Sequence, residues 1–173
     1  MFAQERVERS DIGMEDQESG VRKKEVILLV DDEQDHLIIT SRFLESQGFE
    51  CVCVDRGWDA LRVLSEKAID LILLDLHMPG MDGYCLAENI LSHTKYQSIP
   101  IVAFSCHDLT RFKQRAMRAG MADFVPKPVD RERLLSTVRD QLRLRRRLSQ
   151  LSAIEHDLGD EAAAPAATVP TVS

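Results

Sequence analysis

Short, wholly apolar runs recur along the 173-residue chain and constrain its fold more than any other feature. Residues 26–30, 71–74 and 101–104 each hold only apolar residues in succession. Runs this short and unbroken are typical of strands that are buried on both faces, as in a parallel sheet. Residues 51–54 and 122–125 supply two further strand-like runs. The chain therefore predicts five strands.

Segments with helical periodicity separate these runs. Residues 37–48, 58–67, 84–93 and 109–120 carry apolar side chains at helical spacing, and a last helix begins after Asp130, a good N-cap residue. Five strands that alternate with five helices predict an α/β fold: a five-stranded parallel sheet with helices on both faces.

The ends of the chain differ from this pattern. Residues 1–24 lack apolar periodicity, and residues 1–20 hold six acids against two bases, so a disordered acidic leader is expected over 1–24. The folded domain should cover 25–145, followed over 146–173 by a helix extension and a disordered tail. Leu144, Leu148 and Leu151 continue at helical spacing among arginines. Two interpretations of this extension are open. It is an arm that docks a partner or dimerises, or it is a solvated basic helix end, which is the interpretation we favour.

Composition excludes several classes of function. The formal net charge of −7 disfavours nucleic acid as the main partner, since phosphate backbones demand clustered cations. No apolar stretch approaches the length of a membrane span, and no signal peptide is evident. Cys51, Cys53, Cys85 and Cys106 form no metal-spaced pair, and we interpret Cys51 and Cys53 as reduced core residues. A cytoplasmic location is expected from this reduced state.

Polar residues of a distinctive kind follow four of the five strands. Asp31 and Asp32 follow the first, Asp75 the third, Ser105 the fourth and Lys127 the fifth. In an open parallel sheet, ligands bind outside the carboxyl ends of the strands. Three carboxylates, a hydroxyl and an ammonium should therefore converge at one edge of the sheet.

This constellation favours phosphoryl chemistry. Three adjacent carboxylates repel one another, and Mg2+, which prefers oxygen ligands, would relieve that repulsion. A carboxylate is also a known covalent acceptor that forms an aspartyl-phosphate. Ser105 could hydrogen-bond one phosphoryl oxygen, and Lys127 could pair with another. A single acid here could simply cap a helix, but helix capping does not explain the whole set at four strand ends.

With these residues the chain resembles the receiver domain of two-component response regulators, of the type found alone in the chemotaxis response regulator. The resemblance covers about residues 25–145 and implies a flavodoxin-like receiver fold with strand order 2-1-3-4-5. The matching segments are Leu29-Val30-Asp31-Asp32-Glu33, Asp75-Leu76-His77-Met78-Pro79-Gly80-Met81-Asp82-Gly83, Ser105 after Phe104, and Lys127-Pro128.

The resemblance implies a role for each matching residue. Asp31 and Asp32 would help to hold Mg2+, and the backbone carbonyl of His77 would complete the protein ligands. Asp75 would be both a metal ligand and the phosphoacceptor.

Further roles follow from the same resemblance. Ser105 takes the place of the hydroxyl residue that follows the phosphoryl group on activation. Lys127 matches the family's lysine, and its bond to Pro128 would be cis. Phe124 falls at the aromatic switch position, although it could also be an ordinary core residue of its strand.

We interpret three residues near the predicted acceptor as features specific to this chain. His77 lies two residues after Asp75, while Cys106 and His107 follow Ser105 directly. We hypothesise that His77 and His107 tune the phosphoryl lifetime and that the bulk of Cys106 narrows access to it. The alternative is that both imidazoles simply face solvent.

The function implied is that of a stand-alone response regulator. A sensor histidine kinase or a histidine phosphotransfer protein would donate the phosphoryl group, and the output would be a protein–protein contact or a relay of phosphate. A homodimer through helix four, strand five and helix five is one candidate arrangement. We expect no enzyme with a free substrate, only self-phosphorylation and autodephosphorylation. The alternatives are a constitutive binding module and a phosphatase-type enzyme with Asp75 as nucleophile.

Overall fold

The computed structural model describes residues 23–105, 109–128 and 130–161, with side chains except those of 109–112 and 155–161. A five-stranded sheet forms the centre of the molecule, in the order β2-β1-β3-β6-β7, and every neighbouring pair is parallel. Counted along this sheet alone, the order is 2-1-3-4-5, so the predicted topology is confirmed. Its strands are β1 (Val26–Val30), β2 (Glu50–Val54), β3 (Leu71–Asp75), β6 (Ile101–Ser105) and β7 (Asp123–Pro126).

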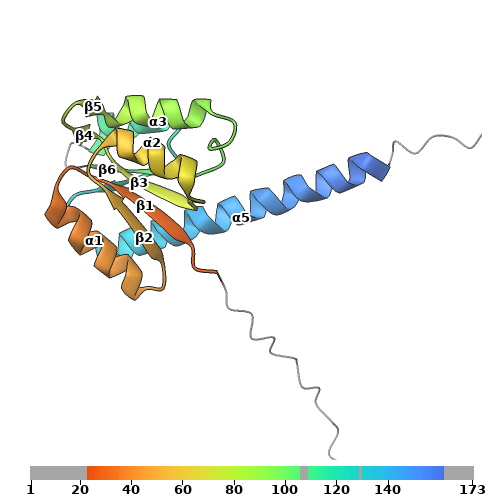
Figure 1. Cartoon of the computed structure of the whole chain (residues 1–173), viewed down its shortest axis with the longest axis horizontal. Helices are drawn as coiled ribbons and strands as arrows, with labels where there is room; N and C mark the ends of the chain where they lie inside the picture. The colour runs from red at the N-terminus through yellow and green to blue at the C-terminus, as the bar shows by residue number, and fades with distance from the viewer. Residues whose placement is uncertain (1–22, 106–108, 129, 162–173) are drawn as a thin grey trace, which may run out of the picture.

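Helices cover both faces of the sheet (Figure 1). One face carries α1 and α5, and the other carries α2, α3 and α4. Every residue of β1, β3 and β6 is buried, which explains why these strands are apolar throughout or nearly so. The helices are α1 (Gln34–Ser46), α2 (Gly57–Glu66), α3 (Gly83–Ser92), α4 (Leu109–Arg118) and α5 (Arg131–Glu161).

Successive strand residues supply the two layers of the core in turn. Ile27 and Leu29 pack beneath α1 and α5, whereas Leu28 and Val30 pack beneath α2 and α3. Each such side chain, when fully buried, contributes about 1.5–3 kcal/mol. The strands are therefore held from both sides, and their carboxyl ends are fixed at one edge.

A small hairpin after β3 was not predicted. The two-residue strands β4 (His77–Met78) and β5 (Met81–Asp82) pair antiparallel between β3 and α3. Gly80 lies at the turn with φ of 82°, a conformation that L side chains rarely adopt. A Cβ on Gly83 would lie 2.5 Å from the carbonyl oxygen of Asp75. The segment after Asp75 therefore folds back tightly on the end of β3.

The prediction that both cysteines of β2 are core residues is wrong for Cys53. Cys53 is exposed, and Cys51 is only partly buried against the layer beneath α1 and α5. The reason is that β2 lies at the edge of the sheet, so its faces are covered less completely. Cys85 is also exposed, and Cys106 lies outside the described residues.

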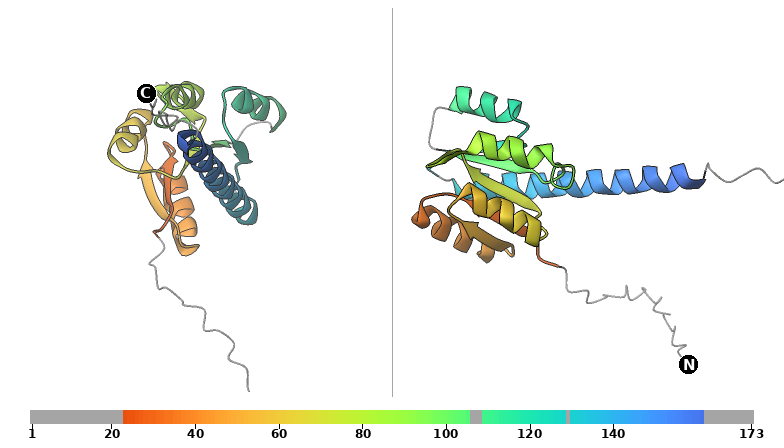
Figure 2. Two further views of the ribbon diagram at one scale, coloured as in Figure 1. Left: turned by 90° about the vertical axis from the view of Figure 1, so that its right-hand side faces the viewer. Right: turned by 45° about the horizontal axis from the view of Figure 1, so that its top comes forward.

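The last helix is much longer than the others, with 31 residues. Asp130 caps it as predicted, since its Oδ1 accepts hydrogen bonds from the N–H groups of Glu132 and Arg133 at 2.9 and 3.0 Å. Leu134 and Val138 pack on the sheet, and the later turns leave the body as a projecting arm (Figure 2). Among the described residues, none of the helices combines the length and apolarity needed to cross a membrane.

Candidate functional site

The carboxyl edge of the sheet brings together the polar residues that the sequence singled out. Asp31 follows β1, Asp75 ends β3, Ser105 ends β6 and Lys127 follows β7. All four are buried. Burial of polar and charged groups is costly unless they are paired or hydrogen-bonded, so the contacts between these side chains decide what the site can do.

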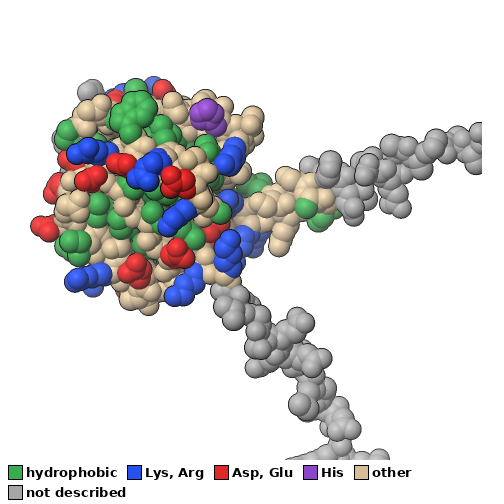
Figure 3. Space-filling view, viewed as in Figure 1, with side chains coloured by type: hydrophobic (Ala, Val, Ile, Leu, Met, Phe, Trp, Pro, Cys, Tyr) green, Lys and Arg blue, Asp and Glu red, His purple; other side chains and the backbone are tan. Residues whose placement is uncertain are grey.

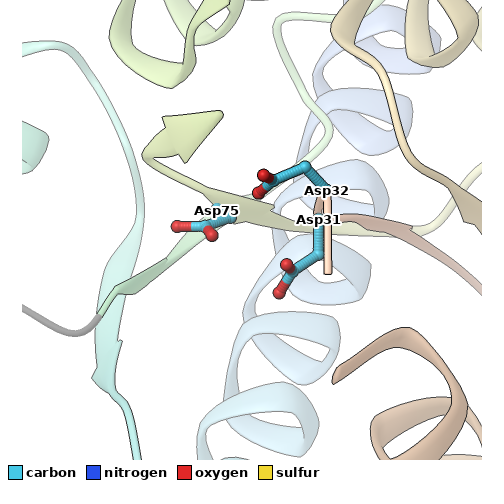
Figure 4. A group of neighbouring side chains, drawn as sticks. All are labelled: Asp31, Asp32 and Asp75. Carbon is cyan, nitrogen blue, oxygen red and sulfur yellow. The ribbon is translucent and has the colours of Figure 1, made fainter. Parts of the chain in front are cut away.

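Three carboxylates form a compact cluster where β1 and β3 end (Figure 4). Asp31, Asp32 and Asp75 each offer one oxygen, and these oxygens lie within 4.8 Å of one another. Asp32 is the most exposed of the three. Backbone N–H groups two residues further on, those of Glu33 and His77, donate to Asp31 Oδ1 at 3.0 Å and to Asp75 Oδ1 at 3.1 Å. The two buried carboxylates are thereby held in fixed orientations.

The ammonium of Lys127 lies between the two buried carboxylates. Its Nζ is 2.6 Å from Asp31 Oδ2 and 3.0 Å from Asp75 Oδ2. Burial by itself lowers the pKa of Lys127, but hydrogen bonds and charge from Asp31 and Asp75 outweigh that effect and raise the pKa overall. The charged form of Lys127 is therefore favoured beside the predicted acceptor.

His36 is a neighbour of the site that the sequence reasoning missed. Its Nδ1 is 3.1 Å from Lys127 Nζ and 3.4 Å from Asp31 Oδ2. Its position in the first turn of α1 could have indicated this contact, because a helix that follows the end of a strand directs its first turn over the carboxyl edge of the sheet. His36 thus gives the Lys127 ammonium a third contact, beside those to the two carboxylates.

Ser105 is fully buried and contacts an imidazole from the hairpin. Ser105 Oγ and His77 Nδ1 lie 3.0 Å apart, which is hydrogen-bond distance. His77 is nevertheless an exposed residue, so both alternatives for it stay open. Cys106 and His107 lie outside the described residues.

Two more predicted features can be placed. Phe124, on β7, is 1% exposed and lies in the core layer beneath α2, α3 and α4. The Lys127–Pro128 bond is cis, as the resemblance implies. The site thus joins the hairpin after β3 to the ends of β6 and β7.

The donor set fits a hard divalent cation. All three clustered ligands are carboxylate oxygens, which Mg2+ prefers, and the exposure of Asp32 leaves one side of the cluster open. Soft metals would favour thiolate or imidazole ligands instead.

Comparison with known proteins agrees with this geometry. The family model of the response regulator receiver domain matches residues 27–139. The chain belongs to the response regulator receiver family. The matched range includes all three clustered aspartates, Asp31, Asp32 and Asp75.

Curated relatives of this receiver are long sensor proteins. It is 35% identical over 115 residues to the sensor protein GacS of Pseudomonas syringae pv. syringae, an alignment that covers 65% of this chain and 13% of GacS. It is 37% identical over 113 residues to the sensor histidine kinase RcsC of Salmonella typhi, covering 65% of this chain and 12% of RcsC. The receiver thus spans only a small part of the length of the curated relatives it matches.

Two solved structures contain the same fold. The chemotaxis response regulator CheY4 of Vibrio cholerae superposes with a TM-score of 0.65 at 25% identity, covering 69% of this chain and 99% of CheY4. NtrX of Brucella abortus, solved in complex with ADP, gives a TM-score of 0.72 at 27% identity, covering 76% of this chain and 30% of NtrX. The receiver fold therefore occurs both as nearly a whole chain and as one part of a longer one.

Proposed function

We propose that this chain is a Mg2+-dependent signalling switch that accepts a phosphoryl group on Asp75. The observation that carries the proposal is the placement of Lys127 Nζ 3.0 Å from the buried Asp75 carboxylate, at the edge where Asp31, Asp32 and Ser105 also lie. A purely structural salt bridge would need one acid, whereas phosphoryl transfer needs a nucleophile, a metal site and a fixed cation together.

The metal would be held by Asp31, Asp32, Asp75 and the backbone carbonyl of His77. When bound, Mg2+ would neutralise charge on the phosphoryl group during transfer. Asp31 and Asp75 are already oriented by backbone N–H groups, so the protein need not reorganise their carboxylates.

Asp75 acts as the nucleophile. A carboxylate oxygen of Asp75 forms the O–P bond while the P–N bond to the donor histidine breaks, and the imidazole leaves with the bonding electron pair. Lys127 needs only a short movement from the Asp75 carboxylate to pair with a phosphoryl oxygen. The hydroxyl of Ser105 donates to another phosphoryl oxygen.

The new dianion on Asp75 draws Ser105 and Lys127 toward it, and Phe124 repacks as the aromatic switch. The change reaches the surface of α4, β7 and α5 as a population shift between two states. That surface binds the downstream protein and is also the candidate face for a homodimer.

The phosphoryl lifetime is tuned by residues beside the acceptor. His77 already holds the hydroxyl of Ser105, so that hydroxyl must exchange partners when the phosphoryl group arrives. Cys106 and His107 would act from the neighbouring segment. Replacement of His77 by Ala should change the dephosphorylation rate, whereas the exposed His93→Ala should not. Equal rates for both variants would remove His77 from this role.

The partners follow from the family. The donor would be a sensor histidine kinase or a histidine phosphotransfer protein, which is supported by the sensor kinases among the relatives. The receiver unit would cover residues 25–145 and work in the cytoplasm as a stand-alone regulator or as a relay of phosphate. It would perform only self-phosphorylation and autodephosphorylation, not turnover of a free substrate.

Intact-protein mass spectrometry tests the central step. The chain is incubated with Mg2+ and a small acyl-phosphate donor, beside a sample in EDTA and the Asp75→Asn variant. One phosphoryl adduct is expected on the wild type with Mg2+, and none in either control. An adduct that persists in Asp75→Asn would place the acceptor elsewhere.

Failure with the small donor calls for a second measurement with a panel of purified histidine kinases. If no kinase phosphorylates the chain, the constitutive binding module replaces the switch. A phosphoryl group acquired only from kinases would keep the switch and restrict its donors.

A further inference from the structure

The projecting end of α5 leaves large apolar side chains exposed. Within the described residues, the last ion pairs from α5 to the body come from Arg145, to Asp70 at 2.9 Å, and from Arg146, to Glu25 at 2.9 Å. The helix continues to Glu161, which corresponds to an arm of about 24 Å. The packed first turns of α5 already nucleate the helix, but along this arm tertiary packing, which supplies most of the stability of protein helices, is sparse among the described residues.

An apolar stripe runs along this arm. Leu144, Leu148, Leu151 and Ile154 are 51, 56, 57 and 55% exposed, and they are half of the eight large apolar side chains exposed on the described residues. The first three follow one another at spacings of four and three, which places them on one side of the helix. Figure 3 shows apolar side chains on the arm where it leaves the body. Such spacing is typical of a helix that packs against another helix.

A groove lies between the root of the stripe and the body. It has a volume of about 500 Å3 and is lined by Leu91, Ile99 and Pro100 from the body and by Leu144 and Leu148 from α5. The apolar surface of the arm therefore continues into the body instead of ending at the helix. A second helix laid along the arm would have its end seated in this groove.

The distribution of charge along α5 indicates that the second helix is the α5 of another copy of this chain. Residues 139–147 hold five arginines and one acid, residues 148–154 hold no charge, and residues 155–161 hold four acids and neither lysine nor arginine. A parallel pair of these helices would set like charges side by side. An antiparallel pair sets the basic segment of each copy against the acidic segment of the other, with the uncharged apolar segment between them.

We propose that two copies of this chain pair through an antiparallel contact of their α5 arms, centred on the Leu148–Leu151 segment. The two bodies lie at opposite ends of the helix pair. The acidic end of each helix reaches the arginines and the groove at the root of the other. The contact does not depend on phosphorylation, so a failure of the proposed switch at Asp75 would not contradict it.

Sedimentation velocity on the full chain without a phosphoryl donor tests the proposal. The wild type should form dimers as its concentration rises. Leu148→Glu/Leu151→Glu should raise the dimer dissociation constant more than about 100-fold, because burial of each leucine contributes about 1.5–3 kcal/mol. Trp58→Glu is the matched control, since Trp58 is 70% exposed on α2 and should leave the dimer unchanged. Far-UV circular dichroism shows that each variant is folded.

Charge reversal tests the orientation. Two variants are needed, one in each charged segment. The first carries Arg143→Glu, Arg146→Glu and Arg147→Glu, and the second carries Glu155→Lys, Asp157→Lys, Asp160→Lys and Glu161→Lys. Each variant alone should be monomeric, because both segments of its helix then carry the same sign. An equimolar mixture of the two should recover a dimer.

Three results would overturn the proposal. The first is a wild-type chain that remains monomeric at every concentration. The second is a dimer that survives Leu148→Glu/Leu151→Glu, which would place the contact on another surface. The third is a dimer that each charge-reversed variant still forms alone. That result would indicate a parallel pair, in which like charges face each other in the wild type as well as in the variants.

Discussion

Removal of the Lys127 ammonium should destabilise the metal-free protein strongly. Lys127→Met leaves the buried carboxylates of Asp31 and Asp75 without the cation that now lies 2.6 and 3.0 Å from them. Loss of one partner from a buried ion pair costs about 3–5 kcal/mol, because the remaining charge stays buried without compensation. The variant should therefore lose that amount of its free energy of unfolding in EDTA.

Mg2+ should restore much of this loss. A cation bound by Asp31, Asp32 and Asp75 would neutralise the same carboxylates, and a ligand present at 100 times its dissociation constant stabilises by about 2.7 kcal/mol. Without the competing ammonium, Lys127→Met should bind Mg2+ more tightly than the wild type. Urea denaturation followed by circular dichroism, with EDTA and with a Mg2+ series, measures both effects. Lys67→Met, at an exposed lysine, is the control.

The same variant gives a pH test. The folded-state pKa of Lys127 is raised above its ordinary value of 10.5, so its ion pairs stabilise fully below about pH 10.5 and are lost as pH rises through the folded-state pKa. The wild type should lose this stability at high pH, and Lys127→Met should show no such loss. A variant within about 1 kcal/mol of the wild type in EDTA, with the same Mg2+ response, would refute the reasoning.

Other parts of the molecule yield three further predictions. Gly83→Ala should destabilise by more than about 1 kcal/mol, because its Cβ would lie 2.5 Å from the carbonyl oxygen of Asp75; thermal melts measure this, and an unchanged melt would contradict the close approach. Tyr84→Phe should leave stability unchanged or raise it by about 1 kcal/mol, since the Tyr84 hydroxyl is buried without a hydrogen-bond partner among the described residues; a clear loss in urea denaturation would reveal a partner. Burial raises the pKa of Cys51 to about 12, from an ordinary value of 9.0, which lowers its thiolate fraction about 1000-fold. Peptide mapping after alkylation at pH 8 should find the exposed Cys85 modified long before Cys51, and equal rates would speak against the burial.

The buried strands and the polar edge of the sheet could be predicted from the sequence because both depend on local patterns, whereas the strand order was implied by the resemblance to receiver domains. Each buried strand of a parallel sheet is an apolar run that is complete within five residues, and the residue that follows it must lie at the carboxyl edge. Asp31, Asp75 and Lys127 could therefore be grouped although 96 residues separate the first from the last.

Contacts that depend on side-chain packing could not be predicted in the same way. The position of Cys53 on an edge strand depends on which strand has no outer neighbour, and the contact of His36 with Lys127 depends on how α1 leaves β1. The hairpin strands after β3 hold only two residues each, too few for any periodicity to show, yet they bring His77 to Ser105.

The sequence by itself determined the α/β fold and the acidic edge, because hydrophobic periodicity and the direction of parallel strands act over a few residues at a time. The order of the strands was implied by the resemblance to receiver domains and not by these local patterns. Only the tertiary structure decided which side chains touch Lys127 and Ser105, and where α5 leaves the body. Those features depend on distances between segments far apart in the chain, and packing in three dimensions sets such distances.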